Sequence, residues 1–216
     1  MKKETLQKRI KIANDIMYYI YTHIETNIDI EELSIDLNVS KFHMHRIFKE
    51  AFGKNIYESI KSIRLQKASN LLLTNKYSTI SNIVNLCGYS SQSSFIKTFR
   101  ERFDMTPKEW RNGGYKEYSK KILQQSPKAM QSKADFKDIT PTIVKMPTFE
   151  SFYIRNKGYN LNIKETWQKL ETWILTNNIT SYKQIALFHD NPTITPLNDC
   201  QYIGCVVVDN IEKIKS

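Results

Sequence analysis

Hydrophobic residues recur at steps of three and four over residues 4–111, a stretch that holds one proline and two glycines. This spacing is typical of amphipathic helices, so the first half of the chain is predicted to be helical throughout. The pattern indicates a first helix that ends near Asn27. A short second helix is expected to open at Asp29 or Ile30 and to carry Leu33 and Leu37.

Two further helices are predicted before residue 75. Ser40 is a good N-cap for the first of them, and Gly53 closes it. The second is a long helix over residues 56–74. Its apolar face is predicted to bury Ile60, Ile63, Leu65, Ala68, Leu71 and Leu72.

The same pattern then returns about fifty residues later. A short helix with Ile80, Ile83, Val84 and Leu86 is followed by a turn and N-cap at residues 88–91, and then by a helix with Phe95, Ile96, Phe99 and Phe103. Thr106 and Pro107 begin a last short helix. The offset is 50 between Leu33 and Ile83 but 51 between Phe48 and Phe99. This indicates an internal duplication whose second copy has one extra residue in its turn.

The pattern changes after residue 112. Residues 113–140 are rich in Lys, Ser and Gln and predict a basic linker, with a short helix around residues 115–123. From Thr142 the apolar positions predict a strand that is interrupted at Pro147. A helix, a short buried strand and a last strand are expected to follow at Ile163–Thr176, Ile185–Phe188 and Tyr202–Val208, with a turn at Asp190–Pro192.

These elements define the predicted fold class. Residues 1–112 form an all-α domain of about seven helices with two helix-turn-helix motifs, and residues 141–216 form a small α+β half-module in the order β-α-β-β. No apolar run is long enough to cross a membrane, and the N-terminus lacks the pattern of a secretory signal. We therefore expect a cytoplasmic protein with no membrane partner.

The first domain carries more of the excess of basic residues than the second. The chain carries a net charge of +10, with 18 basic and 12 acidic residues over residues 1–112 but 8 and 7 over residues 141–216. A basic domain beside a nearly neutral one favours a polyanionic partner for the first. A solvated basic surface explains the charge equally well.

The second helix of a helix-turn-helix motif enters the DNA major groove, so its exposed residues are the candidate contacts with double-stranded DNA. In the first copy these are Ser40, Lys41, Phe42, His43, His45, Arg46 and Lys49. In the second they are Ser91, Gln92, Ser93, Ser94, Lys97 and Arg100. Arginine bonds bidentately to guanine and glutamine to adenine, so Arg46 and Gln92 are candidate base contacts. With two such helices on one chain, a dimer is not obligatory.

Residues 88–100 and 103–107 resemble the signature of the AraC/XylS family of bacterial transcription regulators. Residues 39–49, with Gly53 and the Arg64-Leu65-x-x-Ala68 segment, resemble that family's first helix-turn-helix. The resemblance implies base contacts at the positions used by Mar/Sox/Rob-type members, namely Phe42, Arg46, Gln92, Ser93 and Lys97. It makes RNA polymerase a further candidate partner. The chain departs from the family pattern at Ser34, Val84 and Asp104, where Ala, Ala and Gly are usual.

The second domain is similar to the GyrI-like effector-binding module. The similarity rests on Met146-Pro147, on Trp167 and Trp173, and on residues 188–192 with Pro196 and Cys200. It implies a small apolar or cationic effector, with Tyr153, Tyr159, Trp167 and Trp173 as candidate ligand contacts. Alternatively, the two tryptophans pack in the core and the two tyrosines lie on an edge strand, without contacting a ligand. The family module has two β-α-β-β halves, and the single half here favours a fragment over two paired chains.

Other functions remain as alternatives. A non-specific architectural DNA-binding protein would need only the charge, and a GyrI-like hydrolase of small electrophiles would need a complete cleft with a carboxylate. A DNA-repair methyltransferase would need a reactive cysteine in a Pro-Cys-His-Arg setting, which Cys87, Cys200 and Cys205 lack. Their spacing predicts neither a disulfide nor a metal site. We expect no catalytic residues and no cofactor.

Overall fold

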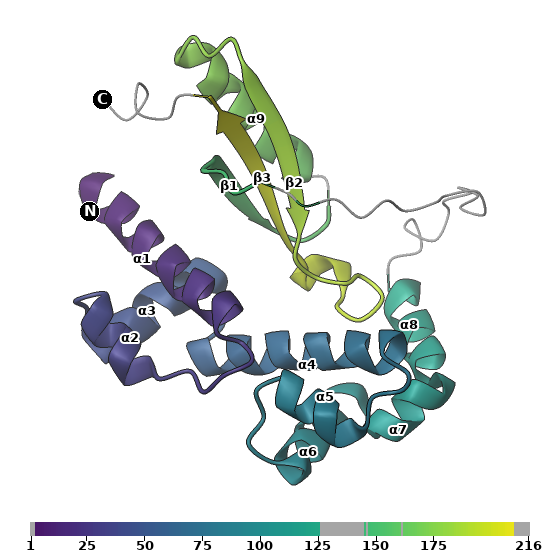
Figure 1. Cartoon of the computed structure of the whole chain (residues 1–216). Coiled ribbons are helices and arrows are strands. Elements are labelled where there is room, and N and C mark those ends of the chain that lie inside the picture. Colours follow the sequence, from purple (N-terminus) through teal and green to yellow (C-terminus); the bar gives the residue numbers. More distant parts are fainter. Residues whose placement is uncertain (1–2, 126–144, 146, 161, 210–216) are drawn as a thin grey trace. The chain divides into compact units, whose positions relative to one another are not determined.

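The computed structural model describes residues 3–125, 145, 147–160 and 162–209 (Figure 1). The chain divides into two compact units after Tyr115. The helices of the first unit have the bounds α1 Lys3–Thr22, α2 Ile30–Asp36, α3 Lys41–Phe52, α4 Ile56–Thr74, α5 Ile80–Leu86, α6 Gln92–Phe103 and α7 Pro107–Glu109. The predicted all-α tandem arrangement of seven helices is confirmed.

The first helix-turn-helix consists of α2 and α3, and α3 packs against both α1 and α2. The carboxylate of Asp29 accepts hydrogen bonds from two backbone amides and begins α2. The Ser40 hydroxyl accepts a bond from the His43 amide and begins α3. Gly53, with φ +70°, ends α3 in the left-handed conformation that glycine adopts without strain. The predicted caps at Ser40 and Gly53 are confirmed.

The second helix-turn-helix, α5 and α6, repeats this construction. The hydroxyls of Thr79 and Ser91 begin its two helices. Asp104 ends α6 with φ +55°, so it occupies the position of Gly53, and aspartate tolerates this conformation better than most residues. The two turns are equivalent up to Val39 in the first copy and Tyr89 in the second. The backbone amides of these residues donate to the carbonyls of Ser34 and Val84, respectively. Ser90 follows as the extra residue of the second turn.

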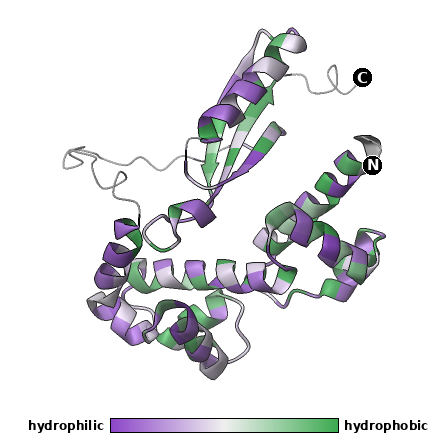
Figure 2. Ribbon diagram, turned by 180° about the vertical axis from the view of Figure 1, so that it is seen from behind, coloured by the Kyte–Doolittle hydropathy of each residue, from purple (hydrophilic) through white to green (hydrophobic). Residues whose placement is uncertain are grey.

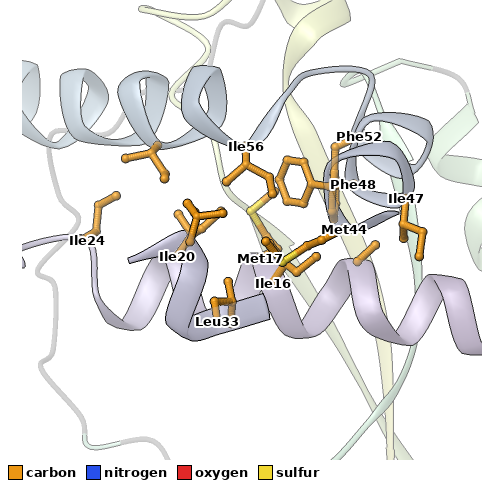
Figure 3. Close-up of a cluster of buried hydrophobic side chains, with 13 residues drawn as sticks. Ile16, Met17, Ile20, Ile24, Leu33, Met44, Ile47, Phe48, Phe52 and Ile56 are labelled. Atoms are coloured by element: carbon orange, nitrogen blue, oxygen red, sulfur yellow. The ribbon is translucent and has the colours of Figure 1, made fainter. Parts of the chain in front are cut away.

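The first copy is held together by an apolar core shared between four helices. Figure 3 shows Ile16, Met17 and Ile20 of α1 beside Leu33 of α2, Met44, Ile47 and Phe48 of α3, and Ile56 of α4. The second copy has an aromatic core instead. Phe95, Phe99 and Phe103 are buried on α6, and Trp110 is fully buried against them. In each copy the core therefore packs against the buried side of the second helix of the motif, α3 or α6.

One detail of the predicted helices is wrong. Helix α1 ends at Thr22 and not near Asn27, because residues 23–26 form a turn in which the Thr26 amide donates to the His23 carbonyl. Ile24 is buried within this turn, so the apolar spacing continues beyond the helix. The predicted short helix with Ile80 and Leu86 is confirmed as α5, whose buried side is made by Ile83 and Val84.

Loss of an N-cap is expected to destabilise a recognition helix measurably. The Ser91 hydroxyl accepts a hydrogen bond from the Ser94 amide at 3.2 Å. We expect Ser91→Ala to lower the free energy of unfolding by about 1 kcal/mol, and Ser91→Asp to retain most of it. Urea unfolding followed by circular dichroism measures this. Ser90→Ala, one residue earlier and outside the cap, is the control, and an equal loss there would contradict the capping role.

The second unit contains the predicted β-α-β-β order. Its elements are β1 Phe152–Lys157, α9 Asn162–Thr176, β2 Tyr182–Phe188 and β3 Gln201–Val208, in an antiparallel sheet ordered β1-β3-β2. Helix α9 packs on β1 and β3 and carries both hydrophobic and hydrophilic residues around its surface (Figure 2). At Gly204 the helix lies so close that an added Cβ would stand 3.1 Å from Leu170 and Thr166. The absence of a side chain at Gly204 therefore allows this close packing.

The prediction of a buried strand at Ile185–Phe188 is wrong in its burial. Strand β2 begins earlier, at Tyr182, and only Ile185 within it is even half-buried. Within the part of the chain that the structure describes, it pairs only with β3 and forms an edge of the sheet. The apolar residues of an edge strand are not necessarily covered, and a short apolar run does not distinguish an edge from a centre.

The region between the units is described only in part. Residues 110–114 continue from α7 as a wide helical turn with Gly113 at φ +115°, and α8, Tyr115–Gln124, is the predicted short helix. The rest of the predicted linker, residues 126–140, lies outside the described residues. Of the strand expected from Thr142, residues 142–144 and 146 also lie outside them, and residues 147–151 are not in a strand.

Candidate nucleic-acid interface

Helix α3 presents one polar face to solvent. Met44, Ile47 and Phe48 are buried beneath it. Phe42, a predicted base contact, is 79% exposed. The predicted contacts Ser40, Lys41, Arg46 and Lys49 are exposed, and His43 and His45 are half-buried.

Two of the cations on α3 are held by neighbours. The Arg46 guanidinium lies 2.9 Å from Nδ1 of His43, one turn earlier on the same helix. The Lys41 ammonium pairs with the Glu31 carboxylate on α2. Both pairs are at the surface, where such contacts contribute little to stability. Their side chains therefore remain available to rearrange toward a ligand.

Helix α6 presents the matching face of the second copy. Ser91, Gln92, Ser93, Ser94, Lys97 and Arg100 are all exposed. Phe95 and Phe99 are buried on the opposite side. The one acidic side chain within the helix, Glu101, is paired with Lys61 of α4 at 2.9 Å, and this ammonium holds the pKa of Glu101 below its usual range. The carboxylate is thus bound to a cation of α4.

A hollow of about 590 Å³ lies beside the start of α3. Its walls come from α1, from the α2–α3 turn and from the first half of α3, and they hold four basic side chains: Lys8, Arg9, His43 and Arg46. Sequence analysis did not identify Lys8 and Arg9 as candidates. Their approach to α3 depends on how α1 packs, which the periodicity of α1 alone does not give.

The structure links two of the four candidate ligand contacts of the second unit: the rings of Tyr159 and Tyr202 each lie 5.1 Å from that of Phe188, and Tyr202 also binds Trp167. Trp167 and Trp173 pack against the core between α9 and the sheet. The Trp167 indole donates to the Tyr202 hydroxyl at 2.6 Å, and the Trp173 ring lies 4.3 Å from that of Phe152. Tyr153 neighbours Phe152 and Ile154, which face α9, so strand alternation directs Tyr153 to the other face. Both tryptophans are half-buried and take part in core packing, and their role as ligand contacts stays a prediction.

Tyr159 is engaged in a loop contact. Its hydroxyl donates to the Asp190 carbonyl at 2.9 Å and accepts from the Asp190 amide at 3.1 Å. Burial raises the pKa of Tyr159 to about 12. The hydroxyl is thus neutral at neutral pH and joins the loop after β1 to the segment after β2.

The three cysteines are free and buried. Burial raises the pKa of Cys87 to about 11 and also raises the pKa of Cys205, which disfavours the nucleophilic thiolate. Among the residues that the structure describes, no group of three or more His, Cys, Asp and Glu side chains is arranged to hold a metal ion. In the same part of the chain, no helix combines the length and apolar character needed to span a membrane.

Two protein families match this chain. Residues 33–113 match a family described as a helix-turn-helix domain, from the middle of α2 to the turn after α7. Residues 139–215 match a family described as a GyrI-like small molecule binding domain. The two matches fall on the two units separately.

Individual relatives are similar over the first unit. The chain is 33% identical to the xylose operon regulatory protein of Escherichia coli over 96 residues, which are 44% of this chain and 24% of that protein. It is 32% identical to the probable transcription factor PqrA of Proteus vulgaris over 105 residues, 48% of this chain and 85% of that protein. Among solved structures, the C-terminal domain of AraT, a response regulator from Geobacillus stearothermophilus, is 27% identical with a TM-score of 0.45. That match covers 47% of this chain and 84% of AraT's domain.

Proposed function

Because this chain belongs to the AraC-type family of helix-turn-helix regulators, we propose that it is a sequence-specific DNA-binding regulator of transcription. The observation that carries the proposal is the pair of equivalent helices α3 and α6. Each begins at a serine cap, buries an apolar face and exposes a face of polar and basic side chains. Two such helices contact two successive segments of the DNA major groove.

The exposed residues divide into two roles. Arg46, Gln92 and Lys97 carry the donors that suit guanine or adenine edges, and Phe42 offers an apolar contact to a thymine methyl group. Lys49 and Arg100 lie further along their helices and suit phosphate contacts, which add affinity without sequence preference. Lys8 and Arg9, in the hollow beside α3, extend the basic surface for the same phosphate backbone.

Two substitutions on α3 separate base contact from phosphate contact. We expect Arg46→Ala to weaken binding to the selected site by about 1–3 kcal/mol and to relax the preference at one base pair. We expect Lys49→Ala to weaken binding to all sequences alike, with a shallower dependence on salt. Affinity measured by fluorescence anisotropy on the selected duplex and on single-base variants, at several salt concentrations, distinguishes the two.

The selected duplex comes from a binding-site selection with the full chain on random DNA at near-physiological salt. Enrichment of one motif with two boxes about one helical turn apart supports the proposal. Tight binding without an enriched motif would replace it with the architectural function. If neither Arg46→Ala nor Lys49→Ala changed the affinity, α3 would not be a recognition helix.

The second unit suggests how such a regulator would be controlled. Its match to a small-molecule-binding family supports an effector site for a small apolar or cationic molecule in this unit. We propose that the effector alters DNA binding, and that the protein acts in the cytoplasm with RNA polymerase as a further partner. The chain spans about a quarter of the length of the xylose operon regulator.

A further inference from the structure

The two helix-turn-helix copies touch each other, besides being joined by α4. Arg64, near the middle of α4, donates from Nε to the Ile24 carbonyl at 3.1 Å and from Nη2 to the Thr26 carbonyl at 2.6 Å. Both carbonyls belong to the turn after α1, in the first copy. The same guanidinium lies 5.9 Å from the ring centroid of Tyr89, in the turn of the second copy. Arg64 thus contacts both copies at once.

Gly88 brings the second copy directly against the same turn. Its φ is +69°, and an added Cβ would stand 2.5 Å from the Ile24 carbonyl oxygen and 2.9 Å from Nη2 of Arg64. The backbone of the α5–α6 turn therefore lies against the backbone of the α1–α2 turn, with Arg64 beside both. A side chain at this position would separate them.

The neighbours of Arg64 reinforce the contact. Lys67, almost one turn further along α4, pairs with Glu25, which lies between the two carbonyls that Arg64 binds. Cys87, adjacent to Gly88, is fully buried. A planar guanidinium presents donors at fixed angles and suits two acceptors at once, whereas an ammonium acts as a compact point charge. The geometry of this contact is therefore specific to arginine.

From these contacts we propose that Arg64 is a positioning residue, which fixes the two recognition helices relative to each other and thereby sets the spacing between the two DNA boxes that the protein accepts. Without it, α4 remains as the continuous connection, and each copy can pivot at its end. Two rigidly linked modules bind a matched pair of boxes as one unit, whereas loosely linked modules tolerate a range of spacings at a lower affinity. The spacing part rests on the proposed function, and the positioning part does not.

The first test measures the positioning without DNA. In the full chain, nitroxide labels on cysteines introduced at Ile35 of α2 and Asn85 of α5, both exposed, report the distance between the copies by electron–electron double resonance. The native cysteines are buried, so labelling is directed to the introduced pair. We expect one narrow distance distribution in the otherwise unchanged chain and a broader one in Arg64→Lys. An unchanged narrow distribution in Arg64→Lys overturns the proposal.

Controls separate positioning from loss of folding. Arg9→Lys makes the same chemical change at an arginine that pairs with Glu50, between α1 and α3 of the first copy, and is expected to leave the distribution narrow. Circular dichroism establishes that each variant retains its helices. Should Arg64→Lys fail to fold, Arg64→Gln, which keeps a shorter donor at this position, provides the second variant for the same measurement.

The second test measures spacing on DNA. Inserting three base pairs between the boxes rotates the second box by about 100° around the duplex. We expect this insertion to weaken DNA binding by the unchanged chain about tenfold or more, and DNA binding by Arg64→Lys less than about threefold. The two proteins are expected to bind a DNA with a single box with equal affinity. Equal losses in the two proteins overturn the spacing role. If the unchanged chain shows no preference between spacers, the proposed function fails, and the distance measurement alone decides the positioning.

Discussion

Gly88→Ala is expected to destabilise the first unit by about 3 kcal/mol or more, measured as the loss in the free energy of unfolding. Two effects add. Alanine at φ +69° is strained, because the left-handed conformation is unfavourable for a residue with a Cβ. This Cβ would also lie 2.5 Å from the Ile24 carbonyl oxygen, which is much closer than a van der Waals contact. The carbonyl is backbone, so it cannot rotate away as a flexible side chain could. Urea unfolding followed by circular dichroism at 222 nm measures the change.

Gly53→Ala is the matched control within the same chain. Gly53 has φ +70°, nearly the same as Gly88, but no atom lies within 4 Å of its added Cβ. We expect this variant to lose only the conformational part, about 1 kcal/mol. The difference between the two variants then measures the contact between the helix-turn-helix copies. Equal losses would mean that the copies separate easily and that Gly88 is needed only for its turn.

Local signals predicted most of the first unit. Helix boundaries depend on caps that lie within a few residues of the hydrogen bonds they make, so Ser40, Ser91 and Thr106 could be identified from the sequence alone. The capping pair of Thr106 and Glu109 is present in both directions. The duplication also predicted which side of α6 is exposed, because its buried phenylalanines repeat the positions of Phe48 and Phe52 in α3.

Features that depend on distant packing were not predicted. Ile24 continues the apolar spacing of α1 but is buried from a turn, and the sequence does not distinguish the two. Strand β2 has the composition of a buried strand and lies at the edge of its sheet. Lys8 and Arg9 reach the hollow beside α3 only through the packing of α1. In each case the deciding neighbour is remote in the sequence.

The contact between the two copies was present in the sequence only as separate signals. Gly88 was identified as a turn residue, yet a turn glycine also permits close approach of a second backbone. Arg64 was noted within a family-like segment, and its partners are main-chain carbonyls, which carry no residue-type signal. The candidate DNA-contacting residues, by contrast, follow from helix periodicity, and their contacts with DNA stay a prediction.

The second large effect is expected for Trp110→Ala, with a loss of about 3–5 kcal/mol in the free energy of unfolding of the first unit. Trp110 is completely buried, with its ring centroid 4.6 Å from that of Phe103 and 5.8 Å from that of Phe99. Its indole Nε1 donates to the Ser69 carbonyl at 3.1 Å, which joins the segment after α6 to α4. Removal of the ring leaves a cavity behind the recognition helix and breaks this connection.

Trp110→Phe separates the packing of the ring from the hydrogen bond. Phenylalanine fills part of the cavity but carries no donor for the Ser69 carbonyl, so its loss should lie between that of Trp110→Ala and zero. Trp173→Ala removes an indole from a half-buried position of the second unit and is the control. It should leave the unfolding transition of the first unit unchanged. A loss below about 1 kcal/mol for Trp110→Ala would contradict a tightly packed aromatic core. The rigidity of α6, and with it the presentation of Gln92 and Lys97, would then need another source.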